Sequence, residues 1–379
     1  MMKHIFPLLI ALIVFSTSCD LKNAETKHNS NAHMNKTLII LFITLIAINV
    51  YSQDTKELLD FEFEEIKLSG VLNLPTDSTP KGIVLIVHGD GKTNAVKDDW
   101  WYDVRMAILK AGYATYMWDK MGCGNSGGSY KNGRPIENEA EEVITAIKHL
   151  KENKIKGSKK IGLWGISRAG WINPTVIDQY KNIDFWISVS GVDDDETFKY
   201  LLEQNLQIND IPKDSINIIV SEWHNSILLS RGGASYKYYL SATKNLRENE
   251  FWKKITSGGT SEESYYIYQK NLQNMALKKE SELPLYVENF DQMLSRIEIP
   301  VLALFGETDI TVDWKKTKTL YGKTLKIKAD LTIKTFPNCN HNMWQAKTGA
   351  IYEFEDKSWE YVRCDGFLDS ITNWLNKLK

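Results

Sequence analysis

The sequence predicts an α/β protein with a mostly parallel central sheet that has helices on both faces. Short, continuous apolar runs such as Ile83–Val87 are typical of strands that are buried on both sides. Segments with apolar residues at helical spacing follow these runs, as in residues 140–150. Strands that alternate with helices in this way favour parallel pairing, because each helix carries the chain back across the sheet.

The elements follow one another in a regular order up to residue 195. An antiparallel hairpin is expected over residues 59–75, where the pattern alternates and turns at Ser69-Gly70. A helix starting near Trp101 ends at Gly112, which is well placed as its cap. The predicted strands are Ile83–Val87, Tyr113–Trp118, Ile161–Trp164 and Phe185–Val189, and after the interruption Pro300–Phe305 and Leu331–Phe336, followed by a closing helix over residues 367–375.

Residues 196–292 interrupt this alternation and are mostly helical in pattern, with many aromatic side chains. We expect them to form a helical cap over the strand ends, inserted between two parts of one core, residues 54–195 and 293–379. The alternative is a helical decoration that packs away from the site. The aromatic residues of the insertion, among them Trp223 and Tyr239, are expected to form the apolar wall of a substrate pocket.

The composition is that of a globular chain: 379 residues, 43% hydrophobic and 25% charged. The net charge of −2 gives no support to nucleic-acid binding, which needs a basic face. The Cys and His residues show no metal-ligand spacing, so no metal is expected, and the sequence implies no cofactor. The chain has four cysteines, and three remain once a leader is removed, so at least one of them is a free thiol. The pattern leaves open whether Cys339 and Cys364 form a disulfide.

The first 53 residues are expected to be a leader that is disordered or removed. Met1 to Cys19 resembles a lipoprotein export signal, and a second signal-like segment begins at Met34. We favour Met34 as the start, which predicts an exported, periplasmic or extracellular protein beginning near Gln53 without a lipid anchor. Translation from Met1 would instead make the protein a lipoprotein. The membrane is involved only through such a signal or anchor.

Gly165-Ile166-Ser167-Arg168-Ala169-Gly170 directly follows a predicted strand and runs into a helical segment. This arrangement is typical of a nucleophile elbow, in which a serine occupies a sharp strand-to-helix turn. Small residues two positions before and after Ser167 allow the backbone segments to approach closely. Ser167 is therefore the candidate nucleophile.

Other candidate groups also follow predicted strands, and ligands of open α/β sheets bind beyond the carboxyl ends of their strands. The sequence resembles the α/β-hydrolase family, in particular its bacterial esterase and serine-aminopeptidase-like branch. It differs from that pattern at Met121, where arginine is usual, and at Ala169, where glycine is commoner. The matching stretches, in the family's order of Ser, acid and His, are Val87–Gly91, Asp119–Gly127, Gly165–Gly170, Phe305–Asp309 and Asn340–Asn342.

The resemblance implies a catalytic triad and an oxyanion hole. Of the seven histidines, His341 stands in a loop after the last strand, where a general base would reach Ser167. Asp309, one tight turn after a strand, is the candidate acid. Its competitors are the run at residues 193–195 and Asp313, which is more simply a helix N-cap. The family's oxyanion hole corresponds to the backbone N–H groups of Asp90 and Arg168.

These candidates together predict a secreted serine hydrolase that cleaves carboxylic esters through an acyl-enzyme on Ser167. The alternative is a peptidase that uses the same triad, with acidic residues such as Glu262 and Glu263 anchoring a substrate amine. The substrate is accordingly a small ester or a short peptide. A third hypothesis is a binding protein that has lost activity on this fold; it is less favoured because every triad position is filled. His88 is expected to have a structural role.

Overall fold

The computed structural model describes residues 55–76, 78–131, 133–193, 198–256, 261–279, 281–355 and 359–378. The predicted leader, both export signals and the expected mature start near Gln53 lie outside these ranges. Within them, no helix combines the length and the apolar character needed to cross a bilayer.

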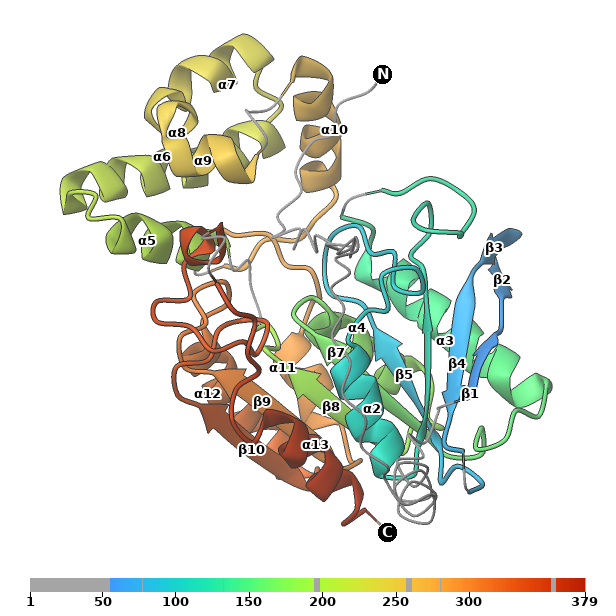
Figure 1. The fold of residues 1–379 in the computed structure, drawn as a ribbon. Helices are drawn as coiled ribbons and strands as arrows, with labels where there is room; N and C mark the ends of the chain where they lie inside the picture. The colour runs from blue at the N-terminus through green and yellow to red at the C-terminus, as the bar shows by residue number, and fades with distance from the viewer. Residues whose placement is uncertain are drawn as a thin grey trace, which may run out of the picture.

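A sheet of eight strands forms the centre of the molecule (Figure 1). The first two strands in the sheet order run antiparallel to their neighbours, and the pairs from β6 to β10 are all parallel. This confirms the predicted mostly parallel sheet. In spatial order the strands are β1 (Thr55–Leu58), β4 (Gly70–Leu74), β6 (Ala114–Trp118), β5 (Ile83–Val87), β7 (Ile161–Ile166), β8 (Phe185–Val189), β9 (Val301–Gly306) and β10 (Leu331–Phe336). A separate hairpin pairs β2 (Phe61–Phe63) with β3 (Ile66–Leu68).

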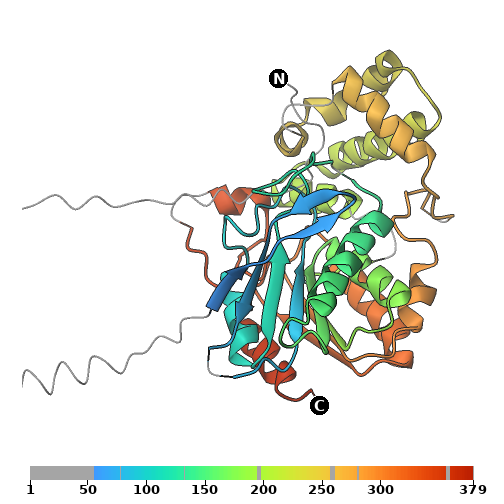
Figure 2. The ribbon, with the colours of Figure 1, turned by 90° about the vertical axis from the view of Figure 1, so that its right-hand side faces the viewer.

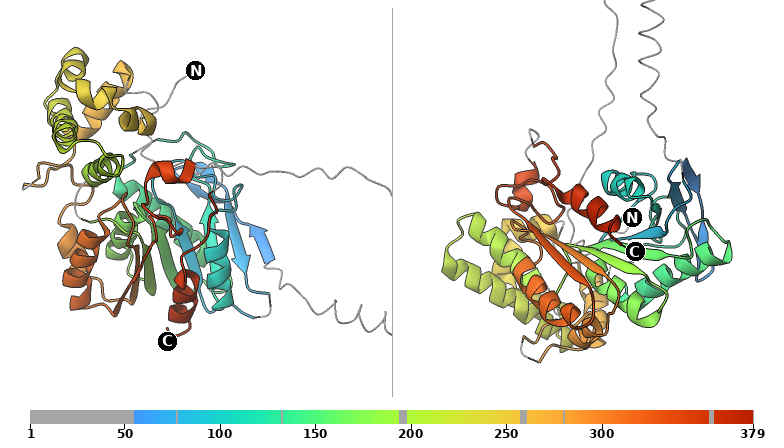
Figure 3. Two further views of the ribbon diagram at one scale, coloured as in Figure 1. Left: turned by 60° about the vertical axis from the view of Figure 1, so that its left-hand side comes forward. Right: turned by 90° about the horizontal axis from the view of Figure 1, so that it is seen from below.

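Helices cover both faces of this sheet, as the view from below in Figure 3 shows. Side chains of β5 alternate between the two faces: Leu85 lies in the cluster under one helix layer, and Ile86 in the cluster under the other. Both faces are buried, which explains the continuous apolar runs of the sequence. One layer consists of α2 (Tyr102–Lys110) and α13 (Phe367–Leu375), and the other of α3 (Ile136–Glu152), α4 (Ala169–Gln179), α11 (Phe290–Ser295) and α12 (Trp314–Thr324), which ends in the 3₁₀ turn η1 (Leu325–Ile327).

The insertion folds into helices that lie over the carboxyl ends of the strands (Figures 1 and 2). They enclose a hydrophobic cluster of their own, separate from the two clusters of the sheet. Its helices are α5 (Phe198–Ile208), α6 (Lys213–Arg231), α7 (Tyr236–Ala242), α8 (Lys244–Glu248), α9 (Glu250–Ile255) and α10 (Glu262–Gln273). We call this group of helices, α5 to α10, the cap.

Two aromatic residues of the cap do not have the role expected from the sequence. Trp223 is 4% exposed and its ring centroid lies 5.6 Å from that of Phe198. Tyr239 is also 4% exposed, with its ring 4.6 Å from Tyr265. The prediction that these two side chains form a pocket wall is therefore wrong, because both are interior residues of the cap.

A loop from the core also supports the cap. It follows β10, contains the 3₁₀ helix η2 (Ile351–Glu355) and returns to α13. The backbone N–H of Ile351 donates to Asn205 Oδ1 of α5 at 3.3 Å, and Lys254 Nζ of α9 lies 4.0 Å from the centre of the Tyr352 ring. In Figure 3, left, η2 lies beside the lower helices of the cap.

Candidate active site

Ser167 occupies the sharp turn between β7 and α4. Its φ of 57° is in the left-handed region, which is uncommon for a residue other than glycine. The turn is held by two hydrogen bonds, from Ser167 N to Val189 O at 3.1 Å and from Gly170 N to Ser167 O at 2.7 Å. A Cβ atom at Gly165 would lie 2.5 Å from the Cβ of Ala169, so the backbone can approach this closely only without a side chain.

His341 and Asp309 come together beyond the ends of β10 and β9. His341 Nδ1 lies 2.8 Å from Asp309 Oδ2, in a pair that is almost fully buried. The other carboxylate oxygen, Oδ1, accepts the backbone N–H groups of Thr311 at 2.9 Å and Val312 at 3.0 Å. The carboxylate is therefore fixed in place, and it orients the imidazole through Nδ1, which leaves Nε2 for a proton transfer.

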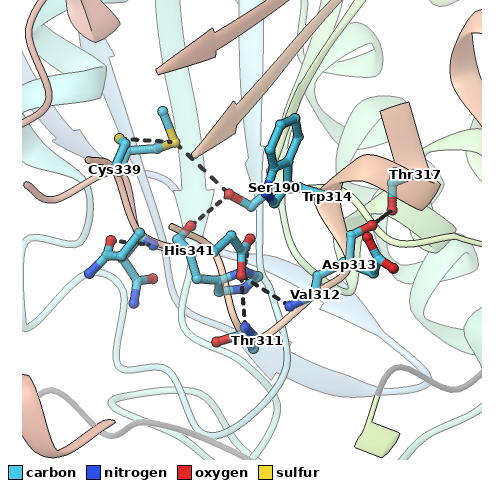
Figure 4. Close-up of polar contacts among 12 residues, drawn as sticks. Ser190, Thr311, Val312, Asp313, Trp314, Thr317, Cys339 and His341 are labelled. Carbon is cyan, nitrogen blue, oxygen red and sulfur yellow. Dashed lines mark hydrogen bonds and ion pairs between the residues drawn. The ribbon is translucent and has the colours of Figure 1, made fainter. Parts of the chain in front are cut away.

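Contacts on three sides hold the loop that carries His341. Ser190 Oγ donates to the carbonyl of His341 at 2.7 Å (Figure 4). The carbonyl of the next residue, Asn342, accepts a bond from Arg363 Nη1 at 2.6 Å. A disulfide between Cys339 and Cys364 closes the base of the loop, which answers the question that the sequence left open. The remaining cysteine in the described ranges, Cys123, is a buried free thiol.

The competing acids are engaged elsewhere. Asp313 caps α12 by accepting the backbone N–H groups of Lys315 and Lys316, both at 3.1 Å. Asp193 is buried and lies 3.0 Å from Lys316 Nζ. The other two aspartates of the 193–195 run lie outside the described residues. The geometry thus favours Asp309, the only one of these candidates seen to pair with His341 in the part of the chain that is described.

The loop after β5 lies directly against the elbow. A Cβ atom at Gly89 would be 3.5 Å from Ser167 Cβ and 3.2 Å from the carbonyl oxygen of Ile166. Among the hydrogen bonds of the described chain, none uses the backbone N–H of Asp90 or of Arg168. Two amides without internal acceptors near the serine are what an oxyanion hole requires.

His88 is part of the scaffold. Its Nε2 lies 2.5 Å from the carbonyl oxygen of Trp118, and its ring packs against Trp100 and Trp118. Burial, together with the positive charge of Lys120, lowers the pKa of His88 to about 3. The imidazole is therefore neutral and serves as a hydrogen-bond donor, in agreement with the structural role expected from the sequence.

Asp119 also has a structural role. Its carboxylate accepts the backbone N–H groups of Val96 at 2.8 Å and Asn125 at 2.9 Å. A Cβ atom at Gly124 would lie 2.0 Å from the same carboxylate, which explains the glycine at that place in the motif. The carboxylate thus ties together two loops beside the site.

A group of charged side chains behind the elbow was not predicted from the sequence. Arg168 Nε donates to Glu139 Oε2 at 2.7 Å, and Lys120 Nζ donates to the carbonyl of Gly89 at 2.6 Å. Arg134 and Glu142 form a second ion pair at 2.5 Å. These residues come from separate loops and from α3, so the only available signal was the position of Lys120 and Arg168 beside recognised motifs. Within the described ranges, no three His, Cys, Asp or Glu side chains converge as metal ligands would.

Comparison with known proteins supports the fold. A scan against protein-family models and a search of curated proteins found no match for the sequence. Among solved structures, DcsB in complex with a substrate analogue is similar with a TM-score of 0.50 and 15% identity, covering 86% of this chain and 99% of that one.

Two further structures match more weakly. An esterase from Pyrococcus furiosus has a TM-score of 0.45 and 18% identity, over 75% of this chain and 84% of that one. A proline iminopeptidase from Mycobacterium smegmatis has a TM-score of 0.48 and 13% identity, over 84% of this chain and 97% of that one. With the strand order described above, the likeness to DcsB shows that this chain has the α/β-hydrolase fold. At such low identity it shows nothing about the reaction.

Proposed function

We propose that this α/β-hydrolase-fold protein is a serine hydrolase that cleaves carboxylic esters through an acyl-enzyme on Ser167. The observation that carries the proposal is the buried contact between His341 Nδ1 and Asp309 Oδ2, at the same end of the sheet as the elbow serine. A serine hydroxyl is a weak nucleophile until a neighbouring base accepts its proton. An imidazole held by a carboxylate at Nδ1 is suited to that task through Nε2.

The proposed reaction has two halves. In the first, Ser167 Oγ attacks the ester carbonyl while His341 Nε2 accepts the hydroxyl proton, and the amides of Asp90 and Arg168 bind the developing oxyanion. Collapse of this intermediate breaks the bond to the alcohol, which leaves with the proton from His341. In the second half a water molecule, deprotonated by His341, attacks the acyl-enzyme and releases the acid.

We favour esters over peptides because the residues suggested as an amine anchor have a simpler explanation. Glu262 and Glu263 lie in the first turn of α10 and are both exposed. Acidic residues at that position offset the positive end of the helix dipole, which is reason enough for their presence. The hypothesis of an inactive binding protein is disfavoured by the paired His341 and Asp309.

A fluorophosphonate probe tests the proposal directly. It should label the protein at Ser167, as located by peptide mass spectrometry, and a panel of nitrophenyl esters should be hydrolysed faster than matched aminoacyl-nitroanilides. Ser167→Ala should abolish labelling, whereas Ser221→Ala, at an exposed serine on α6, should label as the parent does. Labelling that persists in Ser167→Ala would refute the assignment of the nucleophile.

We also propose that the protein is exported and begins near Gln53 without a lipid anchor. The proposal rests on the signal-like segment that starts at Met34. Mass spectrometry of the protein recovered from its native cells should show this start. A diacylated N-terminus at Cys19 would contradict it.

A further inference from the structure

The side chain of Lys120 lies behind the loop that carries the proposed oxyanion donor Asp90. β5 and β6 are parallel neighbours, and Ile83 of β5 pairs with Ala114 of β6. Gly89 follows Ile83 by the same number of residues as Lys120 follows Ala114. The register of the sheet therefore places these two residues side by side just past the strand ends. There, Lys120 Nζ donates to the carbonyl oxygen of Gly89 at 2.6 Å.

This hydrogen bond determines the direction of the Asp90 N–H group. A peptide unit is planar and trans, so its C=O and N–H groups point in opposite directions. The carbonyl of Gly89 and the N–H of Asp90 belong to the same peptide unit. Holding that carbonyl on the Lys120 side consequently turns the Asp90 N–H to the opposite side.

The peptide packs against the elbow, but its orientation has few hydrogen bonds to restrain it. Glycine flanks Asp90 on both sides, and Gly91 has a positive φ of 82°. Glycine restricts rotation of the adjacent peptide units less than any other residue. In the described part of the chain, the bond from Lys120 is the only hydrogen bond made by the backbone groups of Gly89 and Asp90.

Carboxylates near Lys120 oppose the loss of its charge. Burial lowers the pKa of its ammonium group, and Arg168 adds to this shift, while the carboxylates of Glu139 and Asp90 act in the opposite direction. An ionised donor makes a shorter and stronger hydrogen bond than a neutral one. Glu139 also accepts from Arg168 Nε at 2.7 Å, so one carboxylate acts on both Lys120 and Arg168, the residue that supplies the second proposed oxyanion amide.

We propose that Lys120 is a positioning residue for the oxyanion hole: it holds the Gly89–Asp90 peptide so that the Asp90 N–H faces the negative charge that develops on the substrate carbonyl. The proposal rests on the serine-hydrolase function proposed above. Lys120 acts through the backbone and does not itself contact the substrate.

Lys120→Met removes the donor while keeping most of the side-chain volume. Loss of one oxyanion donor typically lowers kcat by about 10²- to 10³-fold, and a donor that is merely released should cost less, about 10- to 100-fold. KM should stay within about threefold, because the interaction matters chiefly in the transition state. Lys120→Arg keeps a charged donor and should recover part of the lost kcat. Lys92→Met is the matched control: Lys92 is an exposed lysine on the loop after β5, the loop that carries Asp90, and should behave as the parent.

A second measurement separates positioning from a general structural effect. The parent and each variant are compared on a nitrophenyl ester and on the thiono ester that has sulfur in place of the carbonyl oxygen. Sulfur accepts hydrogen bonds poorly. The oxygen-to-sulfur ratio, which is kcat/KM for the ester divided by kcat/KM for the thiono ester, therefore reports on the oxyanion hole. Lys120→Met should lower this ratio, whereas a smaller fraction of folded enzyme would lower both rates equally. If Lys120→Met does not fold, Lys120→Gln, which is too short to reach Gly89, should lower the ratio in its place.

The outcomes distinguish this proposal from the function on which it rests. A parent protein that neither hydrolyses esters nor reacts with a fluorophosphonate at Ser167 would overturn the proposed function, and the role of Lys120 with it. An active parent together with an unchanged kcat and an unchanged oxygen-to-sulfur ratio in Lys120→Met would overturn the role of Lys120 alone. A lowered ratio, with Lys92→Met unaffected, would support it.

Discussion

The sheet-containing core and the cap obtain their stability from separate interiors. The core has a hydrophobic cluster on each face of one sheet, and the triad candidates follow the ends of its strands. The cap has a single cluster between its own helices, centred on residues such as Trp223 and Trp252. Near the site, the cap touches the core through Tyr200, whose hydroxyl donates to the carbonyl of Asp309 at 3.3 Å. Because the triad candidates all lie in the core, we expect a change confined to the interior of the cap to leave their arrangement in place.

The largest effect is expected in the core, from Asp309→Asn. An amide can no longer hold His341 in the tautomer that accepts the serine proton, so kcat should fall by roughly four orders of magnitude. Steady-state kinetics on a nitrophenyl ester, with circular dichroism to verify the fold, measure this. Asp313→Asn is the matched control and should stay within about tenfold, because asparagine is also a good N-cap. A reversed order of the two variants would show that the acid is misassigned.

In the cap, Trp223→Ala should affect stability and leave the chemistry intact. Truncating a buried tryptophan costs about 3–5 kcal/mol of unfolding free energy. Urea unfolding of the cap, monitored by limited proteolysis, should show that loss. Under native conditions kcat on a small ester should stay within about fivefold of the parent. Ile218→Ala, at an exposed position of the same helix, should change neither quantity. If the kcat of folded Trp223→Ala falls as far as that of Asp309→Asn, the two regions are not independent.

The core should also carry a specific acid sensitivity through His88. Folded His88 remains neutral down to about pH 3, whereas in the unfolded chain it takes up a proton below about pH 6.5. Unfolding therefore binds one extra proton in this window, and acid favours the unfolded state by up to about 1.4 kcal/mol per pH unit. The folded state therefore has its full stability, with respect to His88, above about pH 6.5, and this part of the stability is lost as the pH falls toward about 3.

His88→Gln, which keeps a donor for the Trp118 carbonyl, should be less dependent on pH over this range. Urea unfolding at several pH values provides the comparison. Parallel curves for the parent and the variant would mean that His88 is not held neutral in the folded protein.

The smallest effect is expected at the cap surface, from Glu262→Gln combined with Glu263→Gln. Both carboxylates are exposed at the start of α10, where an acidic residue contributes about 0.3–1 kcal/mol through the helix dipole. Hydrolysis of esters and of aminoacyl-nitroanilides should both remain within about twofold of the parent. A selective loss on the aminoacyl substrates would favour the peptidase hypothesis and give the cap a direct part in recognition.

The sequence by itself determined the type of fold and the position of each triad candidate along the chain. Both are encoded locally: a strand buried on two faces must be apolar throughout, as in Ile83–Val87, and a tight elbow needs small residues such as Gly165 and Ala169. The preference for Asp309 over Asp313 was also local, because a helix start beside Asp313 marks it as an N-cap.

Only the tertiary structure decided which distant groups meet. The contact of Lys120 with the Gly89 carbonyl depends on the pairing register of β5 and β6, which no local pattern specifies. The disulfide between Cys339 and Cys364 depends on where α13 returns to the sheet. Trp223 is an interior residue because α5 packs against the side of α6 that carries it. Its aromatic character alone would suit an interior position and a pocket wall equally well. Residue type and spacing define a side chain's chemistry, but its partners are set by packing between segments that are far apart in the chain.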